Sequence, residues 1–249
     1  MFPYLRLGPF LLQTPLLALL IGFWIGLSFI ERESGRLGLN REKVNNLIFF
    51  SLVGGIIGTR LTYAAQYASV YLANPLSLFS LNTNTLFSRG GVLVGIAIAF
   101  LYGYRRKLPL RRTLDALTPG LAFFMIALGV SHLLSGDAYG APTRVPWAMY
   151  LWSDYRHPSQ VYEIFLALVI FTIVFTQVIP ASASGVRFFQ FAALSAAARV
   201  FLEAFRGDSL LWLDGYRAAQ IIGLVVLTIS IFLLRKWERT DDDHESNAK

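Results

Sequence analysis

Three charged residues in the last quarter of the chain have a spacing that could bind an anion. Arg199, Glu203 and Arg206 are separated by four and three positions, so a helical segment would place them on one face. Glu203 can pair with either arginine, and the other arginine would then keep an unneutralised charge. Because a buried ion pair often only breaks even against apolar packing, the pattern favours a functional anion site over a purely structural pair.

A fourth charged residue, Arg60, stands inside an apolar, glycine-rich stretch, GGIIGTRL at 54–61. A charge inside a membrane helix costs at least about 2.5 kcal/mol on insertion scales, so Arg60 should face the interior of a helix bundle and have a partner. The glycines would let another helix or a lipid headgroup approach closely. The alternative is a structural ion pair or a side chain that extends to the membrane surface.

Two segments predict helix starts that could bind a phosphate. Pro158 in RHPSQVYE (156–163) suits the first turn of a helix. The free N–H groups that follow, together with the helix dipole, attract anions. Arg89-Gly90-Gly91 opens an apolar segment in the same way, with two residues that lack a Cβ. The alternatives are a surface histidine for His157 and an ordinary helix-start residue for Ser159.

His132, near the end of another apolar segment, is the candidate for proton transfer. It is one of only three histidines, and histidine is the side chain whose charge changes near neutral pH. Asp137 is close enough in sequence to orient it, although spacing alone does not prove a contact. The alternative is a histidine that only makes a structural hydrogen bond.

Membrane-spanning helices must position all of these residues. Of the 249 residues, 55% are hydrophobic and 15% are charged, against about 25% charged in soluble domains. A span needs about 20 apolar residues to cross a hydrocarbon core of about 30 Å. The fold class is therefore an all-α, polytopic integral membrane protein of about seven transmembrane helices. The predicted spans are Leu11–Ile30, Asn46–Ala73, Gly90–Tyr104, Leu117–Leu134, Val161–Ile179, Val186–Phe205 and Ala218–Leu234.

The distribution of basic residues predicts the orientation of these spans. Fourteen Lys and Arg residues, Arg187 among them, lie on one side of the membrane and six on the other. The positive-inside rule makes the first side cytoplasmic, with the N-terminus outside and the C-terminus in the cytoplasm. The first span is expected to stay as an anchor, because one basic residue precedes it and no small-x-small cleavage site follows it.

Composition also bounds the chemistry and the partners. Without cysteine, the chain has no disulfide, thiolate metal site or thiol nucleophile of its own, although a thiol could arrive on a substrate. The net charge of +7 needs no nucleic-acid partner, because anionic lipid headgroups attract basic loops. Residues 1–240 are predicted to form one transmembrane domain, and residues 241–249 an acidic, disordered tail.

Taken in order, these segments resemble the bacterial prolipoprotein diacylglyceryl transferase family over nearly the whole chain. HPSQ-x-YE together with R-x-x-x-E-x-x-R on a later span is the specific part. The matching segments are Leu7–Pro9, Gly58–Leu61, Tyr71–Pro75, Gly90-Gly91, Gly136–Thr143, Arg156–Glu163 and Arg199–Arg206.

The resemblance implies a reaction at the outer leaflet of the bacterial cytoplasmic membrane. Enzymes of this family move the diacylglyceryl group of phosphatidylglycerol to the cysteine thiol of a prolipoprotein signal peptide and release glycerol phosphate, without a metal or other cofactor. Membrane lipids and signal peptides are thus the implied partners. The predicted catalytic residues are His132, Asp137, Arg199 and Glu203. The predicted substrate-binding residues are Arg60, Arg89, Gly90, Gly91, Gly140, His157, Gln160, Tyr162 and Arg206.

Several positions depart from the family pattern. Arg89 replaces the histidine that usually precedes the paired glycines, and an arginine is a poor general base. Gly129 and His132 replace the usual Arg and Asn. The remaining changes are Asp137 for Glu, Ser135 for Asn and Pro15 for Tyr. These departures leave an alternative to the transferase, namely a catalytically degenerate paralogue that acts as a lipid-binding or complex-assembly subunit. An ion or solute transporter would explain the intramembrane arginines but not the motif between the fourth and fifth spans.

Overall fold

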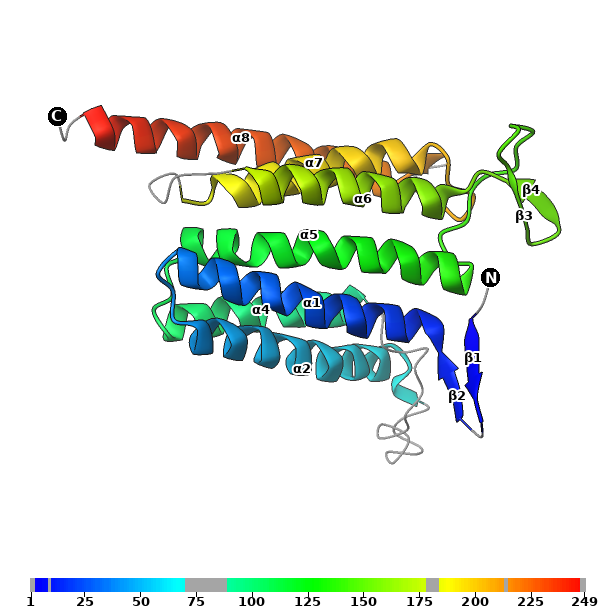
Figure 1. Ribbon diagram of the computed structural model, residues 1–249, viewed down its shortest axis with the longest axis horizontal. Helices are drawn as coiled ribbons and strands as arrows, with labels where there is room; N and C mark the ends of the chain where they lie inside the picture. The colour runs from blue at the N-terminus through cyan, green and yellow to red at the C-terminus, as the bar shows by residue number, and fades with distance from the viewer. Residues whose placement is uncertain (1–2, 9, 70–88, 178–183, 213–214, 247–249) are drawn as a thin grey trace. The chain divides into compact units, whose positions relative to one another are not determined.

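A computed structural model describes residues 3–8, 10–69, 89–177, 184–212 and 215–246 (Figure 1). The chain is mostly helical and divides into two compact units. The first unit comprises Met1–Glu33 with Leu114–Lys249, and the second comprises Ser34–Thr113. We call them the five-helix unit and the two-helix unit and describe each by itself.

The five-helix unit is built around α1, α5, α6, α7 and α8, which run side by side in Figure 1. Small residues let α1 and α5 pack closely, since a Cβ on Gly26 would lie 3.1 Å from the Gly120 carbonyl oxygen. Ala122, Ile170 and Phe191 join α5, α6 and α7 in a buried apolar cluster. The helices are α1 (Thr14–Arg36), α5 (Leu110–Ser135), α6 (Ser159–Thr176), α7 (Val186–Glu203) and α8 (Ala218–Ser246).

Three short β-hairpins, which the all-α interpretation did not include, connect or precede these helices. They are β1 (Tyr4–Leu7) with β2 (Phe10–Gln13), β3 (Met149–Leu151) with β4 (Asp154–Arg156), and β5 (Leu211–Trp212) with β6 (Tyr216–Arg217). In the β3–β4 turn, Trp152 and Ser153 have φ values of 52° and 64°. Left-handed backbone of this kind is what two-residue hairpin loops require. The hydrophobic pattern of the sequence did not indicate this turn, because the turn depends on the backbone geometry of the hairpin.

The two-helix unit pairs α2 (Arg41–Gln66) with α4 (Arg89–Arg105). Asn40 caps α2 by accepting a hydrogen bond from the Lys43 N–H. A Cβ on Gly55 would lie 3.2 Å from the Gly91 carbonyl oxygen, and one on Gly95 would lie 3.0 Å from the Ser51 carbonyl oxygen. The glycines of α2 therefore serve a close helix–helix contact, one of the two uses that the sequence indicated.

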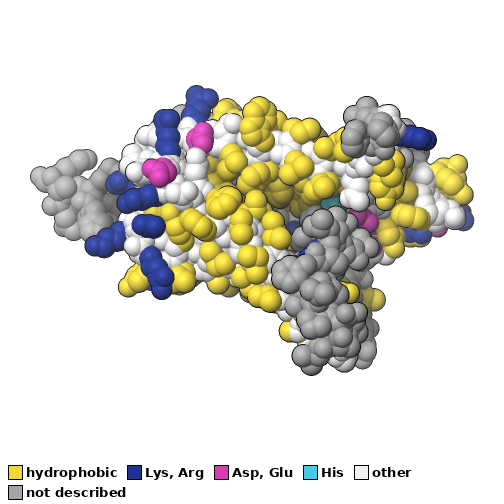
Figure 2. Space-filling view, turned by 90° about the horizontal axis from the view of Figure 1, so that it is seen from below, with side chains coloured by type: hydrophobic (Ala, Val, Ile, Leu, Met, Phe, Trp, Pro, Cys, Tyr) yellow, Lys and Arg dark blue, Asp and Glu magenta, His cyan; other side chains and the backbone are white. Residues whose placement is uncertain are grey.

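In the described part of the chain, five helices are long and apolar enough to cross a membrane, namely α1, α2, α5, α6 and α8. The apolar part of α4 is shorter, and α7 is not among the five. Hydrophobic side chains cover much of the face shown in Figure 2, while Lys and Arg gather toward one end. The chain is thus consistent with a polytopic membrane protein. The number of seven spans and their orientation stay predictions, as do the domain limits; α8 itself runs to Ser246.

Candidate active site

The loop at 136–143, directly after α5, is held on both sides by other candidate segments. The Ala141 N–H donates to the Phe205 carbonyl oxygen (2.8 Å), and the His157 N–H donates to the Ala141 carbonyl oxygen (3.0 Å). The loop therefore lies between the start of α6 and the segment that follows α7. Three motifs far apart in the sequence meet at this point.

Gly140 is required at the centre of this junction because no side chain fits there. It forms an isolated bridge with Arg206, and a Cβ at Gly140 would overlap the carbonyl oxygen of His157. Across the junction, a Cβ on Gly207 would lie 2.7 Å from the Gly140 carbonyl oxygen. Close backbone packing is thus the role that the structure gives Gly140.

Two side chains from the first turn of α6 hold the loop by hydrogen bonds. The Ser159 hydroxyl donates to the Ala138 carbonyl oxygen (2.5 Å), and the Gln160 amide donates to the Asp137 carbonyl oxygen (2.9 Å). Both side chains are buried, and Ala138 has a left-handed φ of 55°, a conformation that needs such support. Ser159 is therefore more than an ordinary helix-start residue. A substrate-binding role for Gln160 stays a prediction.

Aromatic packing surrounds His157. The centre of its ring lies 5.3 Å from that of Phe205 and 6.3 Å from that of Tyr162, and the Tyr162 and Phe205 ring centres are 5.6 Å apart. The Tyr162 hydroxyl accepts a hydrogen bond from the Trp147 indole (2.6 Å). His157 is thus a half-buried member of an aromatic cluster, not a free surface histidine.

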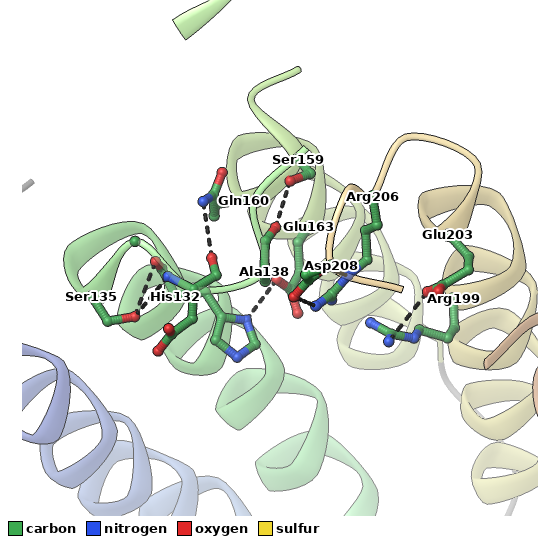
Figure 3. A network of polar contacts seen from close by, with 12 residues as sticks. His132, Ser135, Ala138, Ser159, Gln160, Glu163, Arg199, Glu203, Arg206 and Asp208 are labelled. Carbon is green, nitrogen blue, oxygen red and sulfur yellow. Dashed lines mark hydrogen bonds and ion pairs between the residues drawn. The ribbon is translucent and has the colours of Figure 1, made fainter. Parts of the chain in front are cut away.

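His132, at the end of α5, pairs with Glu163 in the first turns of α6 (Figure 3). Its Nδ1 lies 2.8 Å from Glu163 Oε2, and the two side chains are 25% and 15% exposed. The sequence analysis offered Asp137 as the residue that orients His132. That interpretation is wrong for this structure, because Glu163 occupies this place and Asp137 is exposed. Consecutive antiparallel helices bring the end of α5 next to the start of α6.

The expected triad on α7 divides into two ion pairs. Arg199 Nη2 lies 3.3 Å from Glu203 Oε2, but α7 ends at Glu203, so Arg206 is not on the same helical face. Arg206 instead donates from Nε and Nη2 to the two carboxylate oxygens of Asp208, at 2.8 and 2.7 Å. The prediction of an unneutralised second arginine is therefore wrong. Burial lowers the pKa of Arg206, but the hydrogen bonds and charge of Asp208 outweigh it and raise the pKa.

Charge links these pairs into one cluster at the same end of the five-helix unit. The Glu163 carboxylate acts electrostatically on both Arg199 and Arg206. Glu203 is almost completely buried, at 1% exposure, whereas the Arg199 side chain is 40% exposed. Arg199 is therefore the cation of this cluster most accessible to an anionic ligand. The cluster comprises His132, Glu163, Arg199, Glu203, Arg206 and Asp208.

The remaining predicted residues belong to the two-helix unit. A Cβ on Gly90 or Gly91 would overlap the side chains of Thr62 or Thr59 on α2, respectively, so helix packing already requires both glycines. Arg60 is partly buried on α2. Arg89 begins α4, and its side chain lies outside the described part of the structure, as does the Tyr71–Pro75 motif.

No group of three His, Asp or Glu side chains in the described ranges could hold a metal ion. The arrangement instead suits acid–base and anion chemistry, because it joins an imidazole, carboxylates and guanidinium groups. Two members escaped the sequence analysis as site residues. Glu163 was visible only as the end of the HPSQ-x-YE motif, and Asp208 follows Arg206 by two positions without a helical period.

Comparison with known proteins agrees with this geometry. The family model for prolipoprotein diacylglyceryl transferase matches residues 4–236. Phosphatidylglycerol–prolipoprotein diacylglyceryl transferase of Bordetella parapertussis is 32% identical over 178 residues, 68% of each chain. The protein of that name from Pseudoalteromonas translucida is 30% identical over 173 residues, covering 67% of this chain and 65% of the relative. The one from Synechococcus elongatus is 24% identical over 243 residues, covering 91% and 83%. The chain that brings these motifs together therefore belongs to the prolipoprotein diacylglyceryl transferase family of membrane transferases.

Proposed function

We propose that this chain transfers the diacylglyceryl group of phosphatidylglycerol to the cysteine thiol of a prolipoprotein signal peptide at the outer leaflet of the bacterial cytoplasmic membrane. The observation that carries the proposal is the meeting of the 136–143 loop, the start of α6 and the end of α7 beside His132. Relatives with the corresponding name support the same reaction.

The reaction forms one bond and breaks one bond. The thiol sulfur attacks the glyceryl carbon that carries the phosphate, a C–S bond forms, and the C–O bond to phosphate breaks. The thiol proton must leave before or during the attack, while the departing glycerol phosphate gains a negative charge. His132 is the proposed proton acceptor, and general-base help of this kind contributes about 10² to 10⁴ in rate.

Arg199 is the proposed contact to the departing phosphate. Its side chain is 40% exposed and forms an ion pair with the buried carboxylate of Glu203. A fixed donor of positive charge stabilises the charge that develops on a leaving group more strongly than mobile water does. Glu203 in this proposal keeps Arg199 in place.

Transfer by the purified protein tests the proposal. We expect membranes that contain phosphatidylglycerol and a lipobox peptide to yield the thioether-linked peptide, detected by its mass, together with free glycerol phosphate. Membranes of phosphatidylethanolamine alone should yield neither product. Without transfer in either membrane, the proposal fails and the lipid-binding paralogue becomes the better interpretation.

The outer location can be tested with single cysteines in this cysteine-free chain. Ser153 lies in the β3–β4 turn and Ser184 precedes α7. Ser153→Cys should react in intact cells with an impermeant thiol reagent, and Ser184→Cys should react only after lysis. The reverse pattern would contradict the predicted orientation.

A further inference from the structure

We propose that Glu163 is a positioning residue that fixes the His132 imidazole with its proton on Nδ1 and leaves Nε2 to accept the substrate thiol proton. This inference rests on the proposed function and deepens it, because it says which nitrogen acts and what holds it ready.

The geometry of the pair supports this arrangement. His132 Nδ1 lies 2.8 Å from Glu163 Oε2, the distance of a charge-assisted hydrogen bond. A carboxylate only accepts hydrogen bonds, so Nδ1 must donate. Among the residues that the structure describes, none bonds to Nε2, and the 25% exposure of the side chain leaves the ring open to a ligand.

Two cationic side chains lie near Glu163. Both Arg199 and Arg206 lie close enough for their charges to act on it. An ionised carboxylate stabilises the imidazolium that forms when Nε2 takes a proton, as the acid of a catalytic triad does. Glu163 would thereby act on the reaction through His132, without touching the substrate.

The residue type at position 89 explains why His132, paired with Glu163, is proposed as the proton acceptor in this chain. In the two-helix unit Arg89 stands before the paired glycines, and a guanidinium cannot accept a proton. His132 is located instead at the end of α5, where the next helix presents a carboxylate to it. His132 and Glu163 together therefore form a hydrogen-bonded imidazole–carboxylate pair.

A double-mutant cycle separates positioning from an independent role. Glu163→Gln should lower kcat for transfer by at least about tenfold with little change in KM for the lipobox peptide; the loss from His132→Gln, about 10²- to 10⁴-fold, is the upper limit. In a His132→Gln background, Glu163→Gln should have almost no further effect. Full additivity of the two losses would overturn the inference. Asp154→Asn, an exposed carboxylate-to-amide change on β4, is the matched control.

The assay pH gives a readout that a merely structural role would not move. A free thiol ionises unaided near pH 8.5, so the deficit of Glu163→Gln should shrink as the pH rises through that value. A deficit that stays constant with pH would contradict the inference. Inactivity of the parent protein would contradict the proposed function. A second readout does not require activity and tests the inference by itself.

That second readout is the tautomer of His132, measured by ¹⁵N NMR of the histidine-labelled parent protein and assigned with His132→Gln. We expect a protonated Nδ1 and an unprotonated Nε2 in the neutral ring, and loss of this preference in Glu163→Gln. A neutral ring protonated on Nε2 in the parent would overturn the inference even if the protein proves inactive.

Discussion

Two polar clusters at opposite ends of the five-helix unit use the same side-chain types in different ways. The cluster around His132 joins the end of α5, the start of α6 and the end of α7. The other cluster joins the end of α1, the start of α5, the end of α6 and the start of α7. There the carboxylate of Asp115 accepts from the backbone N–H groups of Gly185 (2.5 Å) and Phe188 (2.9 Å), and Arg187 pairs with Glu33 and donates to the Gln177 carbonyl oxygen (2.7 Å).

The two clusters differ in how far their charged side chains are exposed. Arg187 and Asp115 are both 5% exposed, and the contacts of the cluster connect α1, α5, α6 and the first turn of α7. At the other end Arg199 is 40% exposed and His132 is 25% exposed. A buried cluster cannot be reached by a ligand, whereas a partly exposed one can. We therefore expect the cluster around Arg187 to stabilise the fold and the cluster around His132 to take part in the reaction.

The strongest test of this contrast is His132→Gln. We expect a loss of about 10²- to 10⁴-fold in thioether formation, since general-base help has that magnitude. Retention of phosphatidylglycerol, measured by native mass spectrometry, should not change. Full activity in this variant would leave the transferase in place but remove its proposed base.

The opposite end should respond in stability and not in chemistry. Arg187→Met removes one partner of the buried Glu33 carboxylate, and breaking a buried ion pair destabilises a fold by about 3 to 5 kcal/mol. Thermal unfolding in detergent should show this loss, while the folded fraction keeps its rate of transfer per molecule. Combining Arg187→Met with Glu33→Gln should recover part of the stability, because the buried side chain at position 33 then carries no charge. A rate loss as large as that of His132→Gln would erase the contrast.

The sequence predicted the elements better than the connections between them. Apolar runs of the right length indicated all seven described helices, because hydrophobic length is a local property. Arg187 shows the limit: it was counted as a loop charge, yet it is buried against Glu33, far away in the sequence. The predicted orientation survives its removal from the count, since thirteen basic residues still face six.

The candidate site shows the same limit on a finer scale. Helical spacing placed Arg199 and Glu203 together correctly, because they lie within one helix. Helical spacing failed for Arg206, because α7 ends before that residue and Arg206 pairs with Asp208 in the segment that follows. It also missed that Glu163 meets His132, because contacts between two helices depend on how the loop at 136–143 is held. The spacing of residues in the sequence does not predict how this loop is held.

Arg199→Gln tests the open end as an anion site. A hydrogen bond to a charged group contributes about 1.5 to 3 kcal/mol, so phosphatidylglycerol affinity should fall by about 10- to 150-fold, measured by lipid titration. Glu203→Gln should give a smaller loss by releasing Arg199 from its position. Unchanged lipid retention in Arg199→Gln would remove this residue from the site.

Asp208→Asn is expected to have the smallest effect and the opposite sign. The two hydrogen bonds from Arg206 to Asp208 neutralise the guanidinium, and the amide keeps the shape of the side chain while it removes the charge. Arg206 would then present a net positive charge at the same end of the unit as Arg199. A basic residue near an anionic lipid surface contributes about 1 kcal/mol, so affinity for phosphatidylglycerol should rise by roughly fivefold, with no rise for a zwitterionic lipid. A fall in affinity would mean that Asp208 positions Arg206 for the lipid, and the division of the arginines into one open and one closed pair would then be wrong.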